Sequence, residues 1–131
     1  MPSVFSRILA GELPGRFVHT DERCAAFLTI APITAGHTLV VPREEVDQWT
    51  DLDPGLAAHL FVVAQRVGRG LKAAFRPARV GLVIAGLEVP HTHLHVVGMD
   101  TMADLDFARA DPGVDAAALD DAAERLRAAL G

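Results

Sequence analysis

Three of the six histidines stand at alternate positions of one short segment, as His91, His93 and His95. Side chains alternate between the two faces of a β-strand, so this spacing predicts three imidazoles on one face and the intervening residues packed on a helix. A half-buried strand whose outer face happens to carry histidine is the plain alternative. The rarity of histidine at solvent-facing strand positions disfavours it.

Two kinds of chemistry suit such a row. Histidines in a His-x-His pair on a strand are well placed to bind a metal ion such as zinc. A neutral imidazole, with an ordinary pKa of about 6.5, is also a nucleophile that can attack an electrophile and form a covalent intermediate. Neighbouring imidazoles can then donate to phosphate oxygens and stabilise developing charge. The spacing alone does not decide between the two.

The elements that must position the row follow from capping and periodicity. Ser3 is predicted to cap a short helix that ends at Gly11. Asp53 and Pro54 begin a long helix with apolar residues at helical spacing, and the helix stops before Pro77. Strands are expected at residues 17–19, 24–30, 37–41, 80–85 and 91–97, and a C-terminal helix at residues 116–130.

Short strands in meander order with one long helix predict an α+β fold. We expect an antiparallel five-stranded sheet with the long helix packed on it, plus short helices near the N-terminus and the C-terminus. At 131 residues the chain is predicted to be one domain, residues 1–131, in which residues 98–131 form a C-terminal loop and helix extension.

Composition excludes several classes of partner. The formal net charge of -5 argues against non-specific binding to nucleic acid or to an anionic membrane, although a small phosphorylated ligand needs only a few local donors. Cys24 is the only cysteine, so neither an internal disulfide nor a cysteine-based zinc cluster can form within one chain. No signal peptide or long apolar run is visible, which favours a cytoplasmic location.

The residues around the histidine row match a known pattern in four ordered segments. These segments are residues 5–14, 26–32, 36–43 and 88–97. A lone histidine triplet would be weak evidence, but four segments at the right spacing are strong. From residue 4 to about residue 97 the chain therefore resembles the histidine-triad (HIT) family, and in particular its short, actinobacterial-type members.

The resemblance implies a HIT-like fold, a homodimer and a purine nucleotide site in each subunit. It also implies cleavage at the α-phosphate: the nucleophile takes the nucleotidyl group, expels an amine or phosphate, and water releases the monophosphate. By the same resemblance His93 is the nucleophile. His91 and His95 flank it as phosphate and orientation groups, and His37 supports it. No cofactor is implied.

The resemblance also assigns a nucleotide pocket. Phe5, Ile8, Phe27 and Ile30 would wall the base and ribose, and the backbone amide of Val89 would face phosphate. For the four apolar residues, plain core packing is an equally good interpretation.

Departures from the family pattern concern metal binding first. Many bacterial members hold a structural zinc through two cysteines, a histidine and the first triad histidine. Ser3, Ser6 and Glu45 stand at the first three of those positions here, so only His91 remains. Because such a set lacks soft and imidazole ligands, we expect no metal at this place.

Other departures concern the substrate. Thr29 stands where the family usually has an aspartate that grips the ribose hydroxyls, and Leu87 replaces a glutamine that hydrogen-bonds near the scissile bond. The loop before the triad is also cut short at Gly86. These changes keep the nucleophile but remove positioning groups, which predicts slow turnover or an unusual substrate.

Three functions compete on these residues. The leading one is a hydrolase or nucleotidyl transferase that acts on a nucleoside phosphoramidate or dinucleotide through a covalent nucleotidyl-histidine. A non-catalytic homodimer that binds a nucleotide or a protein partner is the alternative. A metal hydrolase is the third, disfavoured because no carboxylate is paired with the row. His19 and His59 match no family role and are expected at the surface, and Trp49 is expected in the core or at a dimer contact.

Overall fold

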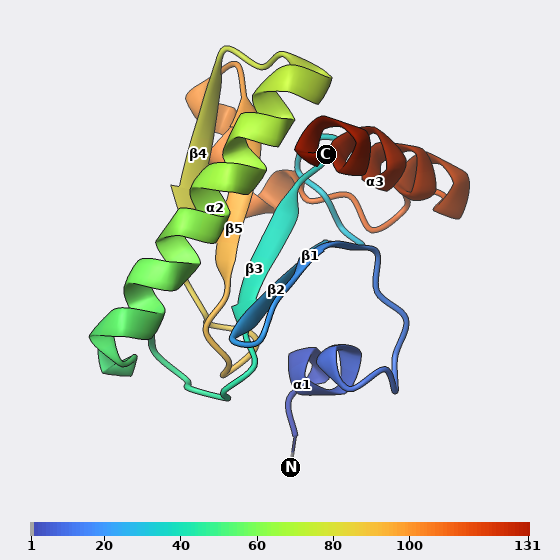
Figure 1. Ribbon diagram of the computed structural model, residues 1–131. Coiled ribbons are helices and arrows are strands. Elements are labelled where there is room, and N and C mark those ends of the chain that lie inside the picture. Colours follow the sequence, from blue (N-terminus) through green and yellow to red (C-terminus); the bar gives the residue numbers. More distant parts are fainter. Residues whose placement is uncertain (1) are drawn as a thin grey trace.

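The computed structural model describes residues 2–131, and Figure 1 shows their arrangement. The helices are α1 (Val4–Leu9), α2 (Pro54–Phe75) and α3 (Ala116–Leu130). The strands are β1 (Phe17–Thr20), β2 (Cys24–Leu28), β3 (Thr38–Pro42), β4 (Arg79–Val83) and β5 (Leu94–Met99). Short 3-10 turns follow β3 and β5, as η1 (Trp49–Asp51), η2 (Met102–Leu105) and η3 (Phe107–Arg109).

The five strands form one antiparallel sheet in the order β1-β2-β3-β5-β4, which confirms the predicted fold class. The meander order holds only for β1 to β3. After β3 the chain passes through α2 to β4 at the far edge, and β5 then inserts between β4 and β3. A helix of 22 residues is about 33 Å long, so α2 can carry the chain that far.

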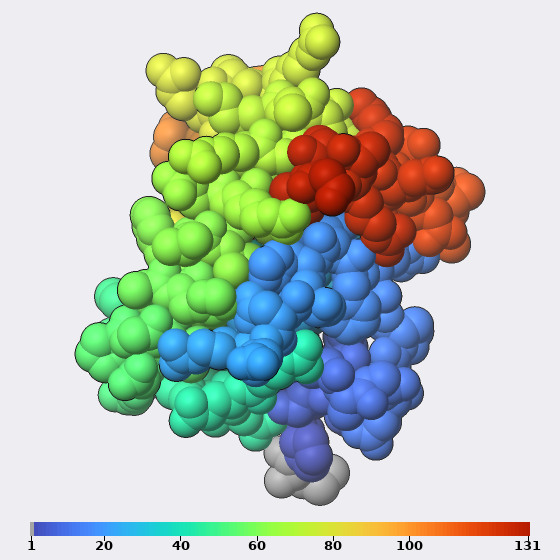
Figure 2. All heavy atoms as spheres, in the orientation of Figure 1, coloured from blue at the N-terminus to red at the C-terminus, as the bar shows by residue number. Residues whose placement is uncertain are grey.

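The main core lies between the sheet and α2, which crosses one face of it (Figure 1). Alternate strand residues such as Val40, Leu94 and Val96 contribute to it from the sheet. The helix α3 packs against α2 and buries Leu126 in the same core. Figure 2 shows α2, α3 and β1 in contact with one another. The segment of residues 98–131 therefore contributes to the core through its helix α3.

The opposite face of the sheet carries the histidines. Phe27, Leu39 and Val41 point to that side and form a second core cluster with Phe5 of α1. His95 alternates with Leu94 and Val96, so its ring lies on the same side as α1. The prediction that the apolar face of this strand packs on the long helix is confirmed.

Several boundaries and exposures differ from the predictions. β5 begins at Leu94, so two of the three histidines precede the strand. Trp49 is half exposed, which makes the predicted core position wrong within one chain. His19 and His59, expected at the surface, are partly exposed there, and both rings bond to the Asp21 carboxylate. No helix within residues 2–131 is long and apolar enough to cross a membrane.

Candidate active site

The three histidine rings gather on one side of the sheet although only one of them lies in the strand. The centroids of the His93 and His95 rings are 4.8 Å apart, and the Phe5 ring stands edge-on to His93 at 4.7 Å. His91 and His93 are held in place by the loop before β5. There Thr92 donates its N–H and its hydroxyl to the Val46 carbonyl, at 2.7 and 2.8 Å.

The ring of His93 has one occupied and one available nitrogen. Its Nδ1 lies 2.7 Å from the backbone carbonyl of His91. A carbonyl only accepts, so Nδ1 carries the proton and Nε2 keeps its lone pair. Burial lowers the pKa of His93 below its ordinary value of 6.5, against the opposing effect of the His91 carbonyl bond. The ring is therefore neutral at physiological pH, with a nucleophilic Nε2.

His37 and His95 form a directed pair beside it. The Ile33 N–H donates to His37 Nδ1 at 3.1 Å, so the proton of that ring is on Nε2 and is donated to His95 Nδ1 at 2.9 Å. The remaining proton of His95 is then on its Nε2. Burial lowers the pKa of His37 to about 4 and, with the neighbouring rings, that of His95 to about 3. Both rings thus stay neutral and keep their donor directions.

His91 is fully buried and uses both ring nitrogens within the protein. Its Nε2–H donates to the Pro42 carbonyl at 2.8 Å, and its Nδ1 accepts the Ser3 hydroxyl at 2.6 Å. The ring therefore fixes the loop whose carbonyl holds the His93 proton.

The residues at the family's zinc position come together as a hydrogen-bonded network. Ser6 donates its hydroxyl to Glu45 Oε1 at 2.8 Å, and the Ser3 N–H bonds to the same oxygen. These two hydrogen bonds, opposed only by slight desolvation, hold the pKa of Glu45 below its usual range. Two hydroxyls, one shared carboxylate and one imidazole do not fit a tetrahedral zinc site, because they include no thiolate, a single imidazole, and a carboxylate oxygen that already bonds to Ser3 and Ser6.

A cavity of about 340 Å³ opens between α1 and β2. Its lining includes five predicted pocket residues, namely Phe5, Ile8, Phe27, Thr29 and Ile30. Phe5 and Phe27 are core residues and Ile8 packs on them, so core packing holds for three of the four apolar residues, and their contact with a nucleotide stays a prediction. Ile30 is largely exposed at the rim, and the Thr29 hydroxyl accepts the Ala31 N–H at 3.2 Å.

A second cavity, of about 480 Å³, is lined by His93, which does not line the first one. Leu87 lines it with a side chain that is 97% exposed, whereas Val89 packs on the cluster around Phe5. Leu87 and Val89, both predicted to contact the nucleotide, therefore lie in different surroundings. Sequence reasoning also missed the other wall of this cavity, which includes Asp47, Gln48 and Trp49. Nothing in the local pattern places that segment, some 45 residues upstream, next to the triad.

A further neighbour of the triad comes from the C-terminal region. The Phe107 ring stands edge-on to His95 with the centroids 4.7 Å apart. The sequence offered one signal for it, an aromatic residue inside an otherwise aspartate-rich loop.

Comparison with known proteins gives matching results. The HIT domain matches residues 10–102. A HIT-like protein of Mycobacterium tuberculosis is 36% identical over 102 residues, which cover 74% of this chain and 71% of that protein. The protein Hit of Bacillus subtilis is 31% identical over 99 residues, with coverage of 72% and 68%.

Two solved structures extend the likeness to nearly the whole chain. A zinc-bound histidine triad family protein from Mycobacterium smegmatis is 32% identical with a TM-score of 0.82, covering 97% of this chain and 91% of its own. A hypothetical histidine triad nucleotide-binding protein from Sulfolobus tokodaii is 26% identical with a TM-score of 0.83, covering 96% of this chain and 90% of its own.

Proposed function

Since this chain belongs to the HIT domain family, a group of nucleotide-binding proteins and hydrolases, we propose that it cleaves purine nucleotides at the α-phosphate through His93. The substrate class is a nucleoside phosphoramidate or a dinucleotide. One observation carries the proposal: the His93 ring holds its proton on Nδ1 against the His91 carbonyl and presents a free Nε2. That is the tautomer an imidazole nucleophile needs.

The first step forms a covalent intermediate. The Nε2 lone pair of His93 attacks the α-phosphorus, a P–N bond to the ring forms, and the bond to the leaving group breaks. The positive charge that develops on the ring is stabilised by the His91 carbonyl at 2.7 Å. His95, whose remaining ring proton is on Nε2, donates a hydrogen bond from that N–H to a phosphate oxygen, and the leaving group takes the proton it needs from solvent.

Water completes the cycle. It attacks the phosphorus of the nucleotidyl-histidine, its proton is released to solvent, and the monophosphate leaves as His93 Nε2 regains its lone pair. The cavity beside α1 would hold the base and ribose, because its walls are aromatic and aliphatic. The second cavity, with Gln48 and Asp47 in its lining, would hold the leaving group.

Intact-protein mass spectrometry tests the proposal. With adenosine phosphoramidate as substrate, an adenylyl adduct should form on the wild type before adenosine monophosphate accumulates. His93→Asn should abolish both the adduct and turnover, because no other ring in the row has its Nε2 free to attack. The same variant should still bind adenosine monophosphate, since the pocket walls are unchanged, and this retained binding is the control for folding.

A second function is favoured by two particular residues. The exposed apolar side chain of Leu87 brings no hydrogen bond to the cavity beside His93, and Thr29 offers the ribose only a hydroxyl. Binding of adenosine monophosphate without any adduct or hydrolysis, across phosphoramidates and dinucleotides, would replace the enzyme with a non-catalytic nucleotide-binding protein.

A further inference from the structure

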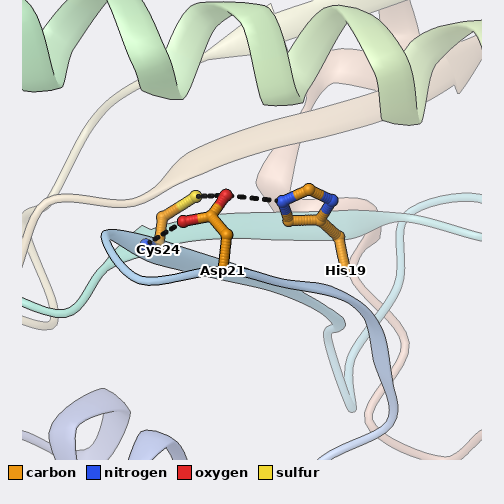
Figure 3. Close-up of side chains that lie close together, drawn as sticks. All are labelled: His19, Asp21 and Cys24. Carbon is orange, nitrogen blue, oxygen red and sulfur yellow. Dashed lines mark hydrogen bonds and ion pairs between the residues drawn. The ribbon is translucent and has the colours of Figure 1, made fainter.

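A second group of metal-ligand side chains lies at the β1–β2 turn, on the α2 side of the sheet. His19, Asp21 and Cys24 stand close together there (Figure 3), and each offers a donor atom within 4.8 Å of the others. His59 reaches the same carboxylate from α2, with its Nε2 2.8 Å from Asp21 Oδ2. The sheet separates this group from the triad, since Cys24 belongs to the core cluster beneath α2.

The Asp21 carboxylate is the centre of the group. Its Oδ1 accepts the backbone N–H groups of Arg23 and Cys24, at 2.8 and 2.9 Å, which fixes the orientation of the carboxylate. Its Oδ2 then faces His19 Nε2 at 2.7 Å, His59 Nε2 at 2.8 Å and Cys24 Sγ at 3.5 Å. Three donor atoms of three chemical kinds, on His19, Asp21 and Cys24, therefore lie close to one another, and His59 contacts the shared carboxylate from α2.

The group is open to solvent on one side and closed at its base. The side chains of His19, Asp21 and His59 are 17%, 26% and 34% exposed, whereas Cys24 is fully buried. Burial, together with the neighbouring Asp21 charge, raises the pKa of the Cys24 thiol to about 12. Without a cation the sulfur is thus a protonated thiol beneath three polar groups.

We propose that His19, Asp21, Cys24 and His59 bind one thiophilic divalent cation of the zinc class. His19, Asp21 and Cys24 supply three ligands that already lie close together, and His59, which contacts the same carboxylate, supplies the fourth when its ring turns toward the ion. The backbone bonds to Oδ1 give the outer support that ligating carboxylates usually have. Binding displaces the thiol proton to solvent and moves each imidazole proton to Nδ1. The two charges of the cation are then balanced by Asp21 and the thiolate.

Arg66 limits the affinity of this site. Its guanidinium donates to His19 Nδ1 and to the Leu130 carbonyl, each at 3.0 Å. A metal-bound His19 carries its proton on Nδ1 and cannot accept that bond, so the exposed Arg66 side chain has to turn into solvent. Its positive charge also opposes the cation. Arg66→Ala should therefore tighten binding several-fold.

Cobalt(II) titration of the metal-free full chain tests the proposal. Because Cys24 is the only cysteine, a thiolate-to-cobalt charge-transfer band in the near ultraviolet can arise from this site alone. We expect the band to saturate at one cobalt per chain and to disappear when zinc is added. The binding constant should rise about tenfold per pH unit, because one thiol proton is released.

Variants distinguish a metal site from a cluster of side chains held together only by hydrogen bonds. Cys24→Ser should remove the band, and His19→Gln and His59→Gln should each weaken cobalt binding at least tenfold. His59 is on a half-exposed helix surface, so its variant tests the site even if Cys24→Ser does not fold. Glu45→Gln, in the sulfur-free network beside α1, is the matched control and should leave the band unchanged. No band in the wild type, or a band that persists in both histidine variants, would overturn the proposal.

Discussion

At the level of single residues, partners from outside the histidine row assign a role to each ring. The Ser3 hydroxyl and the Pro42 carbonyl occupy both nitrogens of His91, which leaves that ring to support the loop. Within the row, only His93 has a ring nitrogen that is both unprotonated and without a partner among residues 2–131. The row thus contains two tautomers, with the proton on Nε2 in His91 and His95 and on Nδ1 in His93.

The pH dependence of activity follows from the burial of His93. Burial lowers its pKa below 6.5, and the neutral ring is the active form. As pH falls, the nucleophile is protonated only once the pH passes this lowered value. We therefore expect kcat/KM to stay level from about pH 8 down to 6.5 and to decline only below that. A pH–rate profile with an acid limb centred at or above 6.5 would show that burial does not protect the neutral form.

At the level of elements, two helices depend on contacts that their own sequences do not display. α1 has only six residues, and Ser3 joins it to the triad by capping Ser6 N–H at 3.0 Å while donating to His91. α2 contains two glycines on its inner side, Gly68 and Gly70, which face different neighbours. Each of these two arrangements makes a prediction that variants can test.

The glycine pair makes a matched comparison. A Cβ at Gly68 would lie 3.4 Å from Val80, an ordinary contact, whereas at Gly70 it would meet Leu130 at 2.7 Å and Leu126 at 2.9 Å. Gly68→Ala should raise the free energy of unfolding by about 0.5–1 kcal/mol through helix propensity. Gly70→Ala should lower it by about 1–2 kcal/mol, because the Leu126 and Leu130 side chains of α3 have to leave their packed positions. Urea unfolding of both variants checks this, and equal effects would contradict the role of Gly70 in seating α3.

The network beside α1 should hold no zinc in the natural chain. Replacing its hydroxyls and carboxylate together, as Ser3→Cys, Ser6→Cys and Glu45→His, would install thiolate and imidazole ligands next to His91. We expect the triple variant to bind one more zinc per chain than the wild type and to lose thermal stability with a chelator. Metal analysis of the purified proteins measures this. If Glu45→Gln alone lowered the zinc content of the natural chain, the network would be a metal site after all.

At the level of the whole molecule, one surface of the single chain remains apolar. Phe61 and Val62 on α2 and Leu82 on the edge strand β4 are exposed, and Trp49 lines the same groove as Phe61 and Leu82. β4 pairs only with β5 on its inner side, so its outer edge is free to pair with another strand. An apolar face beside a free edge favours association with a second copy.

We therefore expect a symmetric homodimer of about 28 kDa by light scattering, twice the chain mass of 13.9 kDa. Leu82→Glu should produce a monomer, because a charge at this edge would have to be buried. As the only tryptophan, Trp49 supplies a second measurement, since its emission should shift to longer wavelength in the variant. A wild type that stays monomeric at micromolar concentration would place these residues at a different contact.

Local pattern was sufficient for much of this protein. The stripe along α2, the caps at Ser3 and Asp53, the strands and the four motif segments indicated the fold class and the family before any contact was known. Such features depend on residues within a few positions of one another, where helical and strand periodicity operate. The row His91, His93 and His95 was visible for the same reason.

The tertiary structure decided what each side chain can do. The partners of His91 are 49 and 88 residues away in the sequence, and the His37–His95 bond spans 58. Periodicity reports only on residues that are near one another in the sequence, so it carries no information about contacts over these sequence separations. The tautomers of the rings and the different surroundings of Leu87 and Val89 could therefore not be predicted. The same holds for the Asp21 group: His59 comes from α2, and only the packing of that helix over the β1–β2 turn brings its ring to the carboxylate.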